Sequence, residues 1–260
     1  MPKQLTRRFL RLIQLSSNLA TLLSCRLVKW TGKSKQPLHP KHLVGDKGAA
    51  WYMNLVRPGD LALDLGAGTG VHAARCLRAG ARGVVAADLS EARLVRARVV
   101  AADVAVWFVC CDGSRTLPLQ SASLGGALLL DILEHLLDPL AALRECARVL
   151  KPGAWVAIAL PNSQTKWKER YRRAGLFWMS DRDHKREFTW PEIAQLIEAA
   201  GLRLQSGPEP IALDTPLTGL ADLVGGFSLS LYRRLNQWRA RQLARHPQET
   251  TGFRCVAIKP

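Results

Sequence analysis

Four apolar runs in this sequence end in residues that could bind a polar ligand. A glycine-rich turn at residues 64–70 follows the first run, and single acids follow the other three: Asp88, Asp112 and Asp131. If the runs are parallel strands, their carboxyl ends meet at one edge of a sheet, where open α/β sheets bind ligands. Carboxylates at such an edge can accept hydrogen bonds from hydroxyl or amino groups.

The glycine-rich turn reads Asp64-Leu65-Gly66-Ala67-Gly68-Thr69-Gly70. Glycines permit positive φ and let a ligand approach the backbone closely. The turn is not the dinucleotide fingerprint G-x-G-x-x-G, because Val71 stands where the third glycine would be. It is also not a P-loop, since no Gly-Lys-Ser/Thr follows it. Asp88, at the next strand end, can accept hydrogen bonds from both hydroxyls of a ribose.

Two histidines are candidate proton acceptors. His135 follows Asp131 and Glu134 in one short segment, and His184 lies in a charged segment further along the chain. Either can act as a general base, with the two acids as helpers. The alternative is structural: a histidine at a helix start, and a surface histidine among charges. No metal site is expected, because none of the six cysteines forms a C-x-x-C pair.

Apolar runs alternate with helical patterns between residues 60 and 160, which predicts a doubly wound, mostly parallel sheet with helices on both faces. Strands are expected at 61–65, 84–87, 104–110, 126–130, 155–160, 202–205 and 253–258. Helices are expected at 71–78, from Glu91 to about Ala102, at 139–150, at 191–200 and around 217–245.

Basic charge is concentrated outside this alternating region. The chain has a net charge of +16, and residues 1–47 hold ten Lys/Arg against one acid, which gives +9. We therefore predict a basic helical extension at 1–47, a core at 48–206, a helical insertion or lid at 207–251, and the last strand of the core at 252–260. A basic flank attracts nucleic acid, an anionic phospholipid surface or an acidic substrate. The alternative is an ordinary solvated surface.

The first 30 residues predict an amphipathic helix, because apolar side chains recur at helical spacing. The stretch is too short and too polar to span a bilayer, and it lacks a clear signal-peptide cleavage site. Such a helix either packs on its own domain or lies on a membrane surface. The residues of the stripe are Leu5, Phe9, Leu12, Leu19, Leu23, Leu27 and Trp30.

The motifs at the strand ends resemble class I S-adenosylmethionine (SAM) dependent methyltransferases, in the branch similar to ubiquinone/menaquinone-biosynthesis enzymes (methyltransferase type 11). The glycine turn resembles the family's first motif, and Asp88-Leu89-Ser90 and Cys111-Asp112-Gly113 resemble the next two. Leu130-Asp131-Ile132-Leu133-Glu134-His135 and the later Leu150-Lys151-Pro152-Gly153 resemble the branch's signature around its fourth strand. One departure is Leu124-Gly125, where the family has Phe-Asp.

The resemblance implies a seven-stranded Rossmann-like sheet and SAM as the cofactor. It assigns the ribose to Asp88, the adenine to Asp112 and its neighbour, and the methionine part to the fourth strand end. The cofactor-binding residues implied are Asp64, Gly66, Ala67, Gly68, Gly70, Asp88, Leu89, Asp112, Gly113, Leu130 and Asp131. The catalytic candidates stay His135 and His184. The resemblance also leaves open a divalent cation near Glu134 and His135, because some quinone-pathway members use acids in this region with a metal.

The branch favours methyl transfer to a small-molecule or lipid-linked metabolite. An alternative is an RNA methyltransferase that binds through the basic flanks, with Trp167, Tyr171, Phe177 and Trp178 as stacking groups. A third is a non-catalytic partner protein with the same fold. We expect a cytoplasmic protein, with a peripheral position on an anionic membrane as the alternative. The acceptor atom and the oligomeric state do not follow from the sequence.

Overall fold

A computed structural model describes residues 2–35, 37, 39–40, 43, 50–100 and 105–260. The chain divides into two compact units, each built from separate stretches. The first unit holds Met1–Ala49, Ser163–Ser180 and Pro210–Thr251, and the second holds Ala50–Asn162, Asp181–Glu209 and Gly252–Pro260. The structure thus groups Ser163–Ser180, which the sequence pattern assigns to the core, with the helical flanks.

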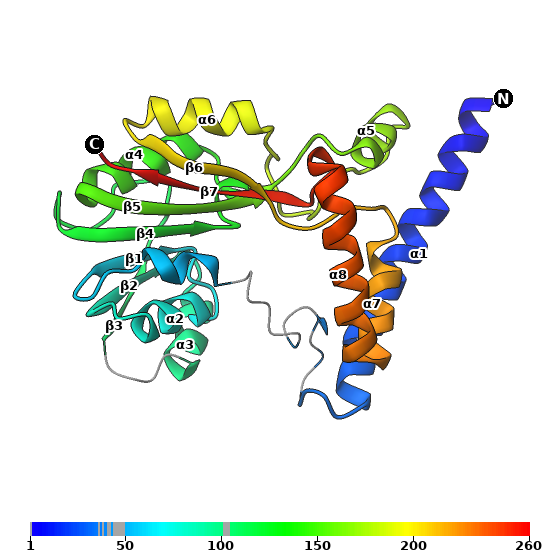
Figure 1. The fold of residues 1–260 in the computed structure, drawn as a ribbon, viewed down its shortest axis with the longest axis horizontal. Helices are drawn as coiled ribbons and strands as arrows, with labels where there is room; N and C mark the ends of the chain where they lie inside the picture. Colours follow the sequence, from blue (N-terminus) through cyan, green and yellow to red (C-terminus); the bar gives the residue numbers. More distant parts are fainter. Residues whose placement is uncertain (1, 36, 38, 41–42, 44–49, 101–104) are drawn as a thin grey trace. The chain divides into compact units, whose positions relative to one another are not determined.

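The second unit contains a seven-stranded sheet in the order β3-β2-β1-β4-β5-β7-β6 (Figure 1). β3, β2, β1, β4 and β5 run parallel, and β7 pairs antiparallel with β5. The predicted doubly wound, mostly parallel sheet is therefore confirmed. The strands are β1 (Leu61–Leu65), β2 (Gly83–Asp88), β3 (Val106–Cys110), β4 (Leu124–Leu130), β5 (Leu150–Pro161), β6 (Arg203–Pro210) and β7 (Gly252–Ile258).

Helices cover both faces of this sheet. Successive side chains of each strand point to opposite faces, so each face presents apolar groups on which helices pack. Leu63 of β1 belongs to the core on the face covered by α4 and α6, whereas its neighbour Ala62 faces the core beneath α2. The helices of this unit are α2 (Val71–Arg78), α3 (Glu91–Val100), α4 (Pro139–Val149) and α6 (Trp190–Ala199).

Most predicted boundaries agree with the structure to within one or two residues, but two strands are longer than predicted. β5 begins at Leu150 rather than 155, directly after α4, because its pairing with β4 continues across a bulge at Leu124/Gly126. β6 continues to Pro210 rather than 205. The predicted helix end near Ala102 and strand start at Val104 lie outside the described residues.

The departure from the family at Leu124-Gly125 has a packing reason. A Cβ at Gly125 would lie 2.3 Å from the carboxylate of Asp60, and a Cβ at Gly126 would lie 2.0 Å from the ring of Trp155. The indole N–H of Trp155 donates to Asp60 at 3.1 Å. The two glycines thus leave room for a buried tryptophan on one side and its hydrogen-bonding acid on the other.

The first unit is helical. It contains α1 (Pro2–Trp30), α5 (Lys166–Arg173), α7 (Thr218–Phe227) and α8 (Leu229–Arg245). The sequence pattern predicts a single helix around 217–245, but the structure shows two that meet at Ser228. Ser228 has an extended backbone and accepts the amide of Leu231, so it ends α7 and caps α8.

The face that α1 turns to its neighbour differs from the predicted apolar stripe. α1 and α7 run side by side (Figure 1), and a Cβ at Gly219 would lie 1.9 Å from the carbonyl oxygen of Ser17. Ser24 is fully buried in this contact region, whereas Leu12 and Leu19 are exposed. Small side chains therefore make the helix contact.

Among the helices that the structure describes, none combines the length and the apolar character needed to cross a bilayer.

The packing of Trp155 over β4 predicts a large cost for one added methyl group. Gly126→Ala should lower the free energy of unfolding by about 3 kcal/mol, because Trp155 is buried and cannot move aside. Gly83→Ala is the matched control, since its Cβ would meet the ring of the half-exposed Trp107 and should cost about 1 kcal/mol. Urea unfolding measures both, and equal costs would contradict the packing argument.

Candidate active site at the carboxyl edge of the sheet

The strand order brings the predicted site segments to one edge. β3, β2, β1 and β4 are parallel neighbours, so the segments that follow them lie next to one another. Leu65 at the end of β1 pairs with Ala87, and Asp88 at the end of β2 pairs with Cys110. The glycine turn, Asp88 and the Asp112 segment are therefore adjacent in that order.

The glycine turn has the backbone that its sequence predicts. Gly66, Gly68 and Gly70 have φ values of 78°, 52° and 75°, all in the left-handed region. A Cβ at Gly66 would lie 2.8 Å from Ile132, and one at Gly70 would lie 3.0 Å from Ala97. At Gly68 the nearest atom would be 3.8 Å away. The outer glycines allow close packing, whereas the middle one is uncrowded, with only the carbonyl oxygen of Gly66 near an added Cβ.

Asp88 holds this turn in place. Its Oδ2 accepts the amide of Gly68 at 2.9 Å, and its Oδ1 accepts the amide of Ser90 at 2.8 Å. The amides of Gly66 and Ala67 both donate to the carbonyl of Ala87. Each carboxylate oxygen can accept more than one hydrogen bond, so Asp88 keeps acceptor capacity for a ligand.

Asp64, the first residue of the motif, is nearly fully buried. Among the described residues, its Oδ2 has no hydrogen-bond partner. Burial raises the pKa of Asp64 to about 7, and the negative charge of Asp88 adds to this rise. The hydrogen bond from the amide of Ala73 lowers the pKa and partly offsets the effect of burial. An unpartnered buried oxygen is costly, and a donor from a ligand or water would satisfy it.

Asp112 is placed differently from the other acids. Its Oδ1 accepts the amide of Ser114, and its Oδ2 lies 3.4 Å from Arg115 Nε. Gly113 packs against Leu65, so the turn lies close to β1. Leu89, next to Asp88, is 73% exposed and presents an apolar side chain at the same edge.

The end of β4 carries backbone strain. Asp131 follows Leu130 with φ +53°, in the left-handed region that non-glycine residues rarely adopt. Its amide donates to Ala159 of β5, which holds it there. A short 3-10 helix at Leu133–His135 follows and presents Glu134 and His135.

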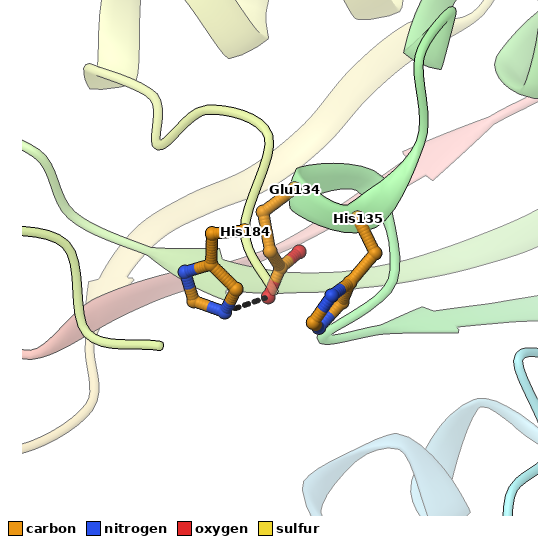
Figure 2. Close-up of side chains that lie close together, drawn as sticks. All are labelled: Glu134, His135 and His184. Atoms are coloured by element: carbon orange, nitrogen blue, oxygen red, sulfur yellow. Dashed lines mark ion pairs between the residues drawn. The ribbon is translucent and has the colours of Figure 1, made fainter. Parts of the chain in front are cut away.

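The structure brings His184 to this turn (Figure 2). The segment that carries His184 pairs with the end of β5 through a bridge between Asn162 and Phe188. Its backbone also donates from Lys185 to the carbonyl of Glu134 at 2.8 Å. The rings of His135 and His184 meet edge to face with centroids 4.8 Å apart. Both predicted catalytic histidines therefore lie together.

His184 lies between two buried carboxylates. Its Nδ1 is 3.0 Å from Glu187 Oε1, and its Nε2 is 3.9 Å from Glu134 Oε1. Burial raises the pKa of Glu134 to about 8, and the charges of Asp131 and Glu187 contribute to that rise. Glu134 Oε2 has no hydrogen-bond partner among the described residues. The arrangement can hold and pass a proton.

The same cluster could hold a divalent cation. Glu134, His135 and His184 each offer one ligand atom, and these atoms lie within 4.8 Å of one another. Two imidazoles and a carboxylate suit several transition metals. The sequence predicts no metal, and that expectation stays a prediction.

Sequence reasoning missed Glu187, which orients His184. Its signal was an acid three residues after the histidine, a spacing too common to single out. It also missed the buried Tyr52, whose hydroxyl lies 2.7 Å from Nδ1 of His72 in α2. Nothing in the sequence around Tyr52 pairs it with that helix.

Comparisons with known proteins agree with the geometry. Residues 63–158 match a family described as a methyltransferase domain. A ubiquinone biosynthesis O-methyltransferase of Parvibaculum lavamentivorans is 32% identical over 150 residues, which cover 55% of this chain and 58% of that protein. A demethylmenaquinone methyltransferase of Corynebacterium urealyticum is 40% identical over 123 residues, which cover 45% of this chain and 51% of that protein.

The fold also matches a solved structure, that of an S-adenosylmethionine dependent methyltransferase from Mesorhizobium loti. The TM-score is 0.57 at 18% identity, over 81% of this chain and 95% of that one. The chain spans 58% and 51% of the length of the two curated relatives. The predicted resemblance is confirmed by the match of residues 63–158 to the methyltransferase domain family.

The buried acid beside His184 predicts a pH-dependent stability. The pKa of Glu134 rises from 4.5 in the unfolded chain to about 8 in the fold, so folding favours the protonated form. The stability from this group is complete below about pH 4.5 and is lost as the pH rises through about 8.

Glu134→Gln, which does not titrate, should therefore gain stability relative to the native chain between about pH 5 and about pH 8. The gain should grow across this interval to on the order of 4 kcal/mol, because one pKa unit corresponds to about 1.4 kcal/mol, and urea unfolding measures it. Glu198→Gln on the exposed face of α6 is the control. A stability difference that does not change with pH would refute the buried, protonated state of Glu134.

Proposed function

We propose that the chain is a SAM-dependent methyltransferase that acts on a quinone-type, small-molecule or lipid-linked acceptor. The observation that carries the proposal is the glycine turn tied to Asp88 at the end of β2. There three glycines in the left-handed region, a carboxylate that accepts the amide of Gly68, and an uncrowded Gly68 come together.

The residues fit a nucleoside with a charged amino-acid tail. Asp88 has acceptor capacity left for two ribose hydroxyls, and Leu89 offers an exposed apolar side chain to the adenine ring. The unpartnered oxygen of Asp64 would accept a donor from the aminoacyl part, directly or through water. Asp112 and Gly113 would border the adenine amino group, and Leu130 and Asp131 the methionyl part.

Bound SAM would supply an activated methyl group, because the sulfonium sulfur that carries it becomes a neutral thioether when the methyl group is transferred. The chain's own contribution is to hold the acceptor in line with that methyl group. Positioning of this kind is worth up to roughly 7–11 kcal/mol of the barrier. A hydroxyl acceptor must also lose its proton as the new O–C bond forms, so a general base contributes.

His184 is the group we assign to receive that proton at Nε2. Glu187 accepts the Nδ1 hydrogen at 3.0 Å, which leaves Nε2 as the basic nitrogen. Glu134, whose pKa is raised to about 8, would be protonated near neutrality and would not compete as a base. His135 lies edge-on to the same ring and lines the site.

The acceptor class rests on the relatives. One is named as a ubiquinone biosynthesis O-methyltransferase and the other as a demethylmenaquinone methyltransferase. An electron-rich ring with a hydroxyl group suits the base described above. A lipid-linked acceptor is consistent with the apolar surface of the helical unit.

The RNA alternative has less support. Of its proposed stacking groups, Tyr171 is buried and packs edge-on against Trp167, whose indole N–H donates to Asp214 at 2.7 Å. The guanidinium of Arg172 covers Trp178 at 4.3 Å from the ring centroid. These rings pack within their own unit and do not form a row of free faces.

Asp88→Ala should weaken the binding of S-adenosylhomocysteine by roughly ten- to a hundredfold, because it removes charge-assisted hydrogen bonds. Titration calorimetry measures this affinity. Asp138→Ala is the control, since it removes the N-cap of α4 and destabilises the fold without touching the glycine turn. Equal losses in both variants, or none in Asp88→Ala, would count against the site.

His184→Gln should lower kcat for transfer from radiolabelled SAM to a catechol acceptor by roughly a hundredfold or more. The KM for SAM should stay within about twofold, because the histidine lies away from the glycine turn. Glu187→Gln keeps an acceptor for Nδ1 and should lose less activity than Glu187→Ala. Unchanged kcat in His184→Gln would remove the base from the mechanism.

A further inference from the structure

We infer that the exposed face of α1, with the neighbouring surfaces of α7 and α8, binds an anionic phospholipid membrane. The inference does not depend on methyl transfer, because it concerns the helical unit alone. The proposed interface consists of the exposed apolar residues of these three helices and the basic side chains among them.

The apolar stripe of α1 faces outward from Leu5 to Leu19 and again at Trp30, whereas Leu23 and Leu27 are partly buried. Leu5, Phe9, Leu12 and Leu19 are between 58% and 73% exposed, and Trp30 at the helix end is 72% exposed. These positions follow one another at intervals of three, four and seven residues, so the first four form one continuous face. A monomeric soluble protein rarely exposes so long an apolar surface without a partner for it.

The polarity of the helical unit is inverted relative to an ordinary amphipathic helix packed on its domain. The contact between α1 and α7 buries polar groups: Asp222 accepts hydrogen bonds from Thr21 and Tyr232 and pairs with His39 at 3.0 Å. Asp222 and Ser24 are almost fully buried, whereas five leucines of α1 are exposed. Helices that pack through small and polar residues and present leucines outward are typical of lipid contact.

α7 and α8 add further exposed apolar groups in the same unit. Phe227, at the end of α7, is 64% exposed, and Leu220 and Leu231 are about half exposed. Leu220 and Phe227 are exposed at the surface because α7 packs on its neighbours through its glycines.

The charges identify the partner. α1 and α8 together contain eleven Lys/Arg residues and no acid, and the one acid of α7 is the buried Asp222. Exposed bases adjoin the apolar face, among them Arg8 and Arg26 on α1 and Arg234 on α8. An apolar face combined with bases matches the acyl chains and anionic headgroups of a membrane.

The same charges argue against a second copy of the chain as the occupant. A symmetric dimer through this face would bring two surfaces of the same sign together, which costs free energy. A nucleic acid would neutralise the bases but would leave the aliphatic stripe of α1 in water. Of these three occupants, only an anionic membrane satisfies both features.

The test is co-sedimentation of the full chain with vesicles. The native chain should sediment with vesicles that contain about a third phosphatidylglycerol. Its affinity for phosphatidylcholine vesicles should be at least tenfold weaker. The double variant Leu12→Glu/Leu19→Glu should lose at least tenfold in affinity for the anionic vesicles. Leu12→Ser/Leu19→Ser should also lose affinity, which separates apolar contact from charge.

Val95→Glu/Val99→Glu is the matched control, because it makes the same change at two exposed positions of α3 in the other unit. It should bind anionic vesicles within about twofold of the native chain. Unchanged helix content by circular dichroism and an unchanged urea midpoint in all variants show that they fold. If native and Leu12→Glu/Leu19→Glu chains bind the vesicles equally, the inference is wrong.

Two further results would also overturn it. One is a stable dimer in sedimentation equilibrium that Leu12→Glu/Leu19→Glu dissociates, which would make the face a contact between copies. The other is binding of single-stranded RNA that this variant abolishes while vesicle binding is absent. In either case, binding of S-adenosylhomocysteine would still decide the proposed function separately.

Discussion

The hydrogen bond from the amide of Gly68 to the carboxylate of Asp88 is the contact on which the site depends. It joins the turn after β1 to the end of β2 and holds a turn with three left-handed glycines, at every second position, in one conformation. A flexible glycine turn would lose much conformational entropy on binding a ligand. Because Asp88 orders the turn beforehand, that cost is met during folding and not during binding.

A second cluster, formed by Glu134, His135 and His184, lies at the end of β4, and burial raises the pKa of its carboxyl group. The left-handed Asp131 turns the chain so that Glu134 points inward, and the Asn162–Phe188 bridge brings His184 to it. Burial, together with the charges of Asp131 and Glu187, raises the pKa of Glu134, and Glu187 hydrogen-bonds one nitrogen of His184. Cofactor binding and proton handling thus occupy neighbouring strand ends of one sheet.

The sequence predicted the features that depend on residues close together in the chain, such as strand and helix boundaries. β1 and α2 begin and end where expected, because the glycines between them permit only a tight turn. The acids at the strand ends were found because topology alone brings parallel strand ends together. Glu187 was missed, since its role depends on a contact formed by a segment about 50 residues away from Glu134. The outward face of α1 was not predictable either, because the choice between its two faces depends on the close approach of Gly219.

The most direct test is a crystal structure of the chain with S-adenosylhomocysteine, the demethylated product of the cofactor. The account predicts density for the ribose hydroxyls within hydrogen-bonding distance of Asp88. It also predicts density for the chain of atoms between the ribose and the amino-acid end of the ligand next to Gly68. Density elsewhere on the sheet, or none with the ligand at saturating concentration in the crystal, would contradict it.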